Sequence, residues 1–254
     1  MKLYHKTYGE GEPFIILHGL FGSSDNWMSV AKLLPKKYHI VLADLRNHGE
    51  SPHSDQWNYK LMAQDVRDLA NELGVEHFHL MGHSMGGKVA MTLAAEFPGI
   101  LTKLIVADIA PKSYPVRHQK IIDALLSIDL KHLESRKEAE DKLAVYIHEA
   151  GVRQFLLKNL SRDSDESYSW KLNLEVINKL LENVGEATIP QETIDTPTLF
   201  IRGSHSDYVT DDDVAEIRKY YANAKVETLG NAGHWLHAER PDAFVETVLD
   251  FLEK

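Results

Sequence analysis

A Gly-x-Ser-x-Gly pentapeptide at residues 82–86 constrains the fold of this chain more than any other feature, because of the segments on either side of it. Residues 77–81 before it form a short apolar segment that is typical of a buried strand. Residues 87–97 after it are rich in helix formers and end at Pro98. The pattern predicts a strand, a sharp turn and a helix, an arrangement that we call the elbow. Ser84 is then strained at the turn, with its hydroxyl exposed above a sheet.

Short apolar runs recur along the chain and are separated by stretches with helical spacing. Strands of this kind that alternate with helices predict an α/β fold, a mostly parallel central sheet flanked by helices on both faces. In such a sheet the active site lies beyond the carboxyl ends of the strands, so polar residues that follow these ends should share one rim. These residues are His18, Asp44, Ser84 and Asp108.

Residues 111–190 break this alternation, because they are strongly helical and charged and contain no convincing strand. We interpret them as a helical cap inserted over the active site rather than as a separate catalytic domain. The α/β core is then expected to comprise residues 1–110 and 191–254.

Ser84 needs a base, because a serine hydroxyl is a poor nucleophile until its proton is removed. Of the 14 histidines, His234 has the best setting. It follows a loop of small residues, 230–233, between the last predicted strand and the last predicted helix. This position gives the chain order serine, acid, histidine. We therefore predict Ser84 as the nucleophile and His234 as the general base.

Two aspartates compete to orient His234. In many serine hydrolases the acid lies three residues after a glycine that ends a late strand; here that position is Ser206, and Asp207 is displaced by one residue. Asp108 ends the strand after the elbow helix, where a carboxylate could accept the imidazole N–H. We favour Asp108, with Asp207 as the alternative acid and Ser206 as a polar helper. Asp108 could instead cap the loop at residues 109–111.

An oxyanion hole needs two backbone N–H groups aimed at the developing charge. The N–H groups of Met85, directly after the nucleophile, and of Leu20 are the expected donors. Because the backbone supplies the donors, neighbouring side chains are free to form an apolar acyl pocket, to which we assign Phe21 and Trp235. Each of these side chains could instead be part of the core.

The remaining polar residues near the predicted strand ends are interpreted as structural. His83 is expected to pack against the sheet, and His18 and His237 to bridge loop backbones. Asp44 and Arg46 are expected to pair and order their loop, and His118 to be a solvated surface residue.

Composition narrows the classes of partner and cofactor. The formal net charge is −10 and no long basic run occurs, which disfavours nucleic acid as a partner. The absence of cysteine excludes a thiol nucleophile, disulfides and cysteine-ligated metal. We expect no metal and no organic cofactor. The sequence shows no signal-peptide pattern at its N-terminus and no apolar run of membrane-spanning length, so a cytoplasmic enzyme without a membrane span is expected. Its oligomeric state is left open.

Five segments together resemble the α/β-hydrolase superfamily: residues 17–27, 44–53, 82–91, 107–111 and 233–239. More narrowly, they resemble the bacterial acyl esterase family typified by YbfF, with its mitochondrial relative, abhydrolase-domain protein eleven. The resemblance runs through nearly the whole chain and is weakest in the predicted cap. It implies serine esterase or thioesterase activity on acyl esters, including acyl-CoA-like substrates. The family pattern also places a serine at Ser206 and the acid at Asp108, and Asp207 departs from it.

The residues and the resemblance predict a carboxylesterase or thioesterase that acts on a small-molecule acyl substrate through an acyl-enzyme on Ser84. The first alternative is a C–C bond hydrolase or lyase that uses the same triad. The second is a non-catalytic receptor that binds a ligand on the same fold.

Overall fold

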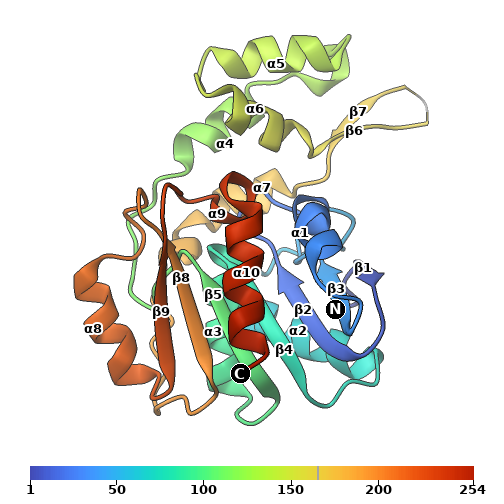
Figure 1. The fold of residues 1–254 in the computed structure, drawn as a ribbon. Helices are drawn as coiled ribbons and strands as arrows, with labels where there is room; N and C mark the ends of the chain where they lie inside the picture. The colour runs from blue at the N-terminus through green and yellow to red at the C-terminus, as the bar shows by residue number, and fades with distance from the viewer. Residues whose placement is uncertain (165) are drawn as a thin grey trace.

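The structure is a computed structural model that describes residues 1–164 and 166–254. Its centre is a seven-stranded sheet in the order β1-β3-β2-β4-β5-β8-β9 (Figure 1). β1 pairs with β3 in the antiparallel direction, and the other neighbouring strands of this sheet are parallel, which confirms the predicted fold class. The strands are β1 (His5–Tyr8), β2 (Glu12–Leu17), β3 (Tyr38–Ala43), β4 (Phe78–His83), β5 (Leu101–Ala107), β8 (Thr198–Gly203) and β9 (Ala224–Leu229).

Helices cover both faces of the sheet and bury separate apolar clusters against it. The buried side chains of α2, α3 and α8 belong to one cluster, and those of α1 and α10 belong to the other. No helix in the described part of the chain is long and apolar enough to cross a membrane. The helices of these layers, with the short turns beside them, are η1 (Ser24–Trp27), α1 (Met28–Leu33), α2 (Tyr59–Glu72), α3 (Met85–Glu96), α8 (Asp211–Tyr220), α9 (Leu236–Glu239) and α10 (Pro241–Leu252).

The helix α2 shows how local sequence sets the bounds of these elements. At its start the Asn58 side chain accepts a hydrogen bond from the Leu61 N–H, which satisfies one of the free donors of the first turn. Its buried positions include Met62, Val66 and Leu69, which share one helical face. Gly74, with φ of +70°, follows the C-cap residue Leu73 and ends the helix.

The register of the parallel strands brings their carboxyl ends level. His83 of β4 is the partner of Ala107 of β5, and Ala107 is in turn the partner of Ile201 of β8. Ser84 and Asp108 directly follow two of these ends and therefore lie at the same edge of the sheet.

Residues 111–190 lie beyond this edge and carry most of their helices above it (Figure 1). Their buried side chains belong to the same apolar cluster as α2 and α3, so the inserted segment packs on the core. The expectation that it contains no strand is wrong, because β6 and β7 form an antiparallel pair. Each has three residues, too few for an alternating pattern to be seen in the sequence. The elements are α4 (Gln119–Leu126), η2 (Leu130–His132), α5 (Arg136–Ala144), α6 (Ala150–Leu157), β6 (Leu160–Arg162), β7 (Tyr168–Trp170), α7 (Leu174–Lys179) and η3 (Leu181–Gly185).

Candidate active site

Ser84 occupies the turn between β4 and α3 in a strained backbone conformation, with φ of +53° and ψ of −118°. Its N–H donates to the Ala107 carbonyl at 3.0 Å, and its own carbonyl accepts from the Lys88 N–H at 3.1 Å, so the turn is held on both sides. A Cβ atom on Gly82 would lie 2.1 Å from the Gly86 carbonyl oxygen, which only glycine avoids. The predicted strand, turn and helix are therefore all present, and the surrounding hydrogen bonds stabilise the strain.

His234 is hydrogen-bonded to Asp108 and not to Asp207. Its Nδ1–H donates to Asp108 Oδ2 at 2.8 Å. The Asp108 carboxylate has no exposed surface, and it also accepts from the Gly203 N–H at 3.0 Å and from the Ser206 hydroxyl. Because the Asp108 carboxylate oxygens accept from Gly203 and Ser206 as well as from His234, the proton of the imidazole is assigned to Nδ1, and Nε2 is left as the acceptor nitrogen.

Asp207 makes no hydrogen bond to His234 and is 69% exposed. It forms an ion pair with Arg117 at 2.7 Å, and the hydrogen bond to that guanidinium lowers the pKa of the Asp207 carboxyl. The one-residue displacement noted in the sequence thus places Ser206 against Asp108 and turns Asp207 outwards.

The rings of Tyr208 and His83 both contact His234. The ring of Tyr208 is stacked on the imidazole, with centroids 3.9 Å apart and planes 15° apart. His83, the last residue of β4, donates from Nε2 to the His234 carbonyl at 2.8 Å, so it links this strand to the loop of His234. Burial lowers the pKa of His83 well below its usual value, and the nearby His234 and His237 lower it further. The Ser84 hydroxyl makes no hydrogen bond within the described residues; in unliganded enzymes such bonds often tighten only on substrate binding.

The loop that carries Leu20 lies against the elbow. A Cβ atom on Gly19 would lie 3.3 Å from Ser84 Cβ. The loop is closed by a hydrogen bond from the Gly22 N–H to the Gly19 carbonyl at 2.9 Å. Within the part of the chain that the structure describes, the Leu20 N–H has no acceptor, and Met85 is the first residue of α3, whose N–H has no partner inside the helix. Both predicted oxyanion donors are therefore available.

The two buried histidines assigned to loop bridging differ in outcome. His18 bridges as expected: its Nδ1–H donates to the Gly19 carbonyl at 2.8 Å, and its Nε2 accepts from the Leu45 N–H at 3.0 Å. His237 does not bridge, since it is stacked on Trp27 with centroids 4.2 Å apart, and its Nδ1 has no partner among the described residues. Stacking against an aromatic side chain leaves no trace in local sequence.

A narrow pocket is lined by Ser84 and Met85. Within the described residues, no Asp or Glu side chain lines this pocket, and most of the lining is apolar or aromatic. Phe21 and Trp235 do not line it. Phe21 is buried, and Trp235 is 37% exposed. The lining consists of Tyr59, Ser84, Met85, Lys88, Ile109, Tyr114, Pro115, Val116, Arg117, His118, Leu181, Val184, Gly185 and Tyr208.

The expectation that His118 is a solvated surface residue is wrong. It lines the pocket, and its ring packs edge-on against Phe21 with centroids 6.1 Å apart. Burial, with smaller contributions from the nearby His234 and Arg117, lowers the pKa of His118 to about 4. The inserted segment folds back over the site at this point, which the helical pattern could not indicate.

Lys88 is a pocket residue that the sequence reasoning missed. It is 1% exposed, and its ammonium donates to the carbonyls of Lys112 at 2.5 Å and Glu186 at 2.6 Å, near the two ends of the inserted segment. Burial lowers the pKa of Lys88 to about 7. The available signal was a charged residue within the otherwise apolar first two turns of the helix that follows Ser84.

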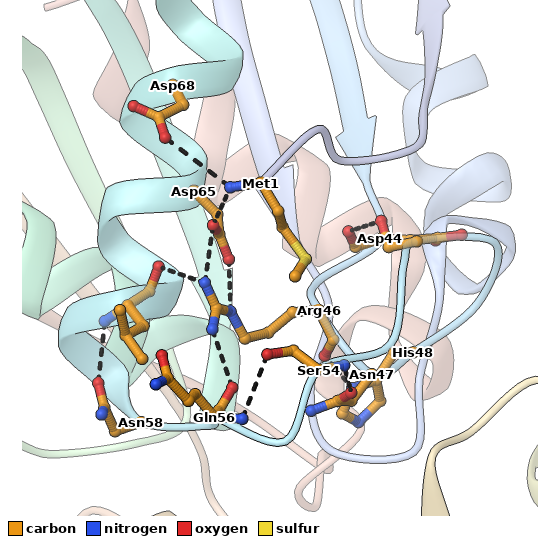
Figure 2. Close-up of polar contacts among 12 residues, drawn as sticks. Met1, Asp44, Arg46, Asn47, His48, Ser54, Gln56, Asn58, Asp65 and Asp68 are labelled. Carbon is orange, nitrogen blue, oxygen red and sulfur yellow. Dashed lines mark hydrogen bonds and ion pairs between the residues drawn. The ribbon is translucent and has the colours of Figure 1, made fainter.

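Asp44 and Arg46 both order the loop after β3, but they do not pair with each other (Figure 2). Asp44 accepts from the Ser24 N–H at 2.6 Å and from the Glu50 N–H at 2.8 Å. Arg46 forms two bonds with Asp65 of α2, at 2.6 and 2.8 Å. Arg46 bonds to Asp65 of α2 because a buried guanidinium is stabilised by a carboxylate that accepts two hydrogen bonds from it.

No group of three or more potential metal ligands occurs among residues 1–164 and 166–254.

Comparisons with known proteins show the family of the chain. The sequence profile described as alpha/beta hydrolase fold matches residues 12–139. The mouse sn-1-specific diacylglycerol lipase ABHD11 is 40% identical over 248 residues, which cover 94% of this chain and 80% of that protein. Esterase YbfF of Escherichia coli K12 is 36% identical over 242 residues, which cover 94% of this chain and 92% of that protein. A solved structure, a marine microorganism esterase, is 44% identical with a TM-score of 0.96, and the match covers 98% of this chain and 99% of that one. The profile match and these identities over nearly the full length show that the chain belongs to the α/β-hydrolase fold family.

Proposed function

We propose that the chain is a serine hydrolase that cleaves carboxylic ester bonds of small acyl substrates, and thioesters such as acyl-CoA, through an acyl-enzyme on Ser84. The observation that carries this proposal is the hydrogen bond from His234 Nδ1 to the buried Asp108. It lies at the sheet edge where the strained Ser84 immediately precedes α3. The names of the relatives, which include esterases and a lipase, support ester hydrolysis as the reaction class.

In the first half of the reaction, Ser84 Oγ attacks the carbonyl carbon and its proton passes to His234 Nε2. The negative charge moves to the carbonyl oxygen, where the N–H groups of Leu20 and Met85 stabilise it. The imidazolium is stabilised by Asp108, whose orientation is supported by Ser206. Collapse of the intermediate breaks the bond to the leaving oxygen or sulfur, and His234 returns the proton to that atom.

In the second half, His234 accepts a proton from water, and the resulting hydroxide attacks the acyl carbon. The intermediate collapses to release the carboxylic acid, and the proton returns to Ser84 Oγ. Water is consumed, and the products are an acid and an alcohol or thiol, so the reaction balances without a further reactant.

We propose that residues 111–190 act as a cap that shapes the acyl site over the core made of residues 1–110 and 191–254. This is supported by the lining of the Ser84 pocket, to which Val116, Leu181 and Val184 contribute apolar side chains. Phe21 and Trp235, which do not line this pocket, remain candidates for contact with the leaving group. A cytoplasmic location remains a prediction.

The test compares the wild type with Ser84→Ala on p-nitrophenyl butyrate and on butyryl-CoA. Alanine and serine both carry a Cβ atom and meet a similar steric cost at the positive φ of this position, so the variant should unfold at the same temperature as the wild type. We expect loss of turnover and of covalent labelling by a fluorophosphonate, with the wild-type label on Ser84 by mass spectrometry. Full activity in the variant would overturn the mechanism. Hydrolysis of a dienone-type acid without ester hydrolysis would favour the C–C bond hydrolase.

A further inference from the structure

The side chain of Asn159, from the inserted segment, reaches the loop that carries the proposed oxyanion donor Leu20. It is 3% exposed and lies between α6 and β6. Its Nδ2 donates to the Phe21 carbonyl at 2.8 Å and to the Leu156 carbonyl at 3.1 Å. Both amide hydrogens are therefore used, and the opposite amide orientation would place an oxygen against two carbonyls.

The backbone of Asn159 is itself fixed within the inserted segment. Its N–H donates to the Leu156 carbonyl at 3.1 Å, and its carbonyl accepts from the Lys171 N–H at 2.9 Å. The side chain thus projects from a rigid corner between the helix α6 and the β6–β7 pair.

Phe21 needs such support. Its φ of +60° is an unfavourable conformation for a bulky side chain, which persists only where neighbours hold it. Along the chain, the Leu20 N–H lies between the carbonyls of Gly19 and Phe21. The core holds the first, because His18 donates to the Gly19 carbonyl. The inserted segment holds the second, because Asn159 donates to the Phe21 carbonyl. His118, also from the inserted segment, contacts the Phe21 ring.

We propose that Asn159 is a positioning residue that fixes the turn at Phe21 and thereby aims the Leu20 N–H at the oxyanion. The inserted segment then completes the oxyanion hole in addition to enclosing the acyl group. This inference rests on the proposed serine hydrolase function. An oxyanion donor is effective only when its direction is set before the charge develops, so loosening this turn weakens binding of the transition state more than binding of the substrate.

The test uses Asn159→Leu, which keeps a side chain of similar size and removes both donors. Asn183→Leu is the matched control, because Asn183 also lies in the inserted segment and donates from Nδ2 to a core carbonyl, that of Trp57, at 2.7 Å. We expect Asn159→Leu to lower kcat by about 10- to 100-fold with KM for p-nitrophenyl butyrate changed by less than about 3-fold. The affinity of a trifluoromethyl ketone, which forms an oxyanion on Ser84, should fall by a similar factor. Asn183→Leu should change kcat and the affinity of the trifluoromethyl ketone by less than about 2-fold each, whatever its effect on Tm.

Equal effects of the two substitutions, or a loss confined to KM, would overturn the positioning role. If Asn159→Leu does not fold, the pair Asn159→Ala and Asn183→Ala is compared in the same way. Ser84-dependent turnover of the wild type separates the two proposals. If it is present, a negative result for Asn159 refutes only this inference; if it is absent, the proposed function and this inference fail together.

Discussion

Replacement of Asp108 by asparagine tests the central hydrogen bond of the site. The carboxylate accepts three hydrogen bonds, from His234, Ser206 and Gly203. Asparagine keeps one oxygen for the Gly203 N–H but places an NH₂ group where His234 and Ser206 now donate. Asparagine also tolerates the φ of +51° at this position, so the backbone should be retained.

The expected loss follows from the tautomer of His234. The Ser206 hydroxyl can rotate and accept from the new NH₂ group. The imidazole can accept only by moving its proton from Nδ1 to Nε2, which leaves Nε2 unable to take the proton of Ser84. We expect kcat to fall by about 10³- to 10⁴-fold, or about 4 to 5.5 kcal/mol of transition-state stabilisation. Stability should fall by only about 1 to 3 kcal/mol, the usual cost of a lost hydrogen bond to a buried charge.

The assay measures kcat and KM on p-nitrophenyl butyrate and the urea unfolding midpoint, with Asp207→Asn as the matched control. Asp207 pairs with Arg117 at the surface, where ion pairs contribute little, so its replacement should change kcat by less than about 2-fold. A similar loss in both variants, or a loss below about 10-fold in Asp108→Asn, would refute the tautomer argument.

Two further predictions concern the pH dependence of stability. Burial lowers the pKa of Lys88 from 10.5 to about 7. Between these pH values the unfolded chain therefore binds more protons than the folded chain. The wild type should gain stability relative to Lys88→Met as the pH rises from about 7 to about 10. Urea unfolding of both proteins across this range measures the difference, and a constant difference would contradict it. Burial lowers the pKa of His237 to about 3 from 6.5, so its contribution is lost as the pH falls below about 6.5, by up to about 1.4 kcal/mol per pH unit. His237→Phe, which can keep the stack on Trp27, should be less sensitive to acid than the wild type; equal slopes of Tm between about pH 7 and about pH 5 would argue against this.

The elbow was predictable because its signals are local. The glycines at residues 82 and 86, the apolar strand before Ser84 and the helix formers after it act within one turn of the chain. The alternation of strands and helices likewise implies a parallel sheet, and a parallel sheet brings the ends of its strands to one edge. Ser84, Asp108 and His234 could therefore be proposed together before their contacts were known.

The identity of the carboxylate beside His234 could only be weighed from the sequence. It depends on the pairing of β5 with β8, which places the Gly203 N–H against Asp108, and on Arg117, which the inserted segment brings to Asp207. Pairings of this kind join residues far apart in the chain, and neither strand carries a local sign of its partner.

The sequence by itself determined the fold class, the elbow and the order of serine, acid and histidine, because periodicity, glycine placement and helix ends are properties of neighbouring residues. Tertiary structure alone decided how the inserted segment meets the core. Asn159 on Phe21, Lys88 near both ends of the segment, and His118 in the pocket are contacts across the fold. Each depends on the direction of a single side chain after packing, and that direction is set by partners which no local pattern specifies.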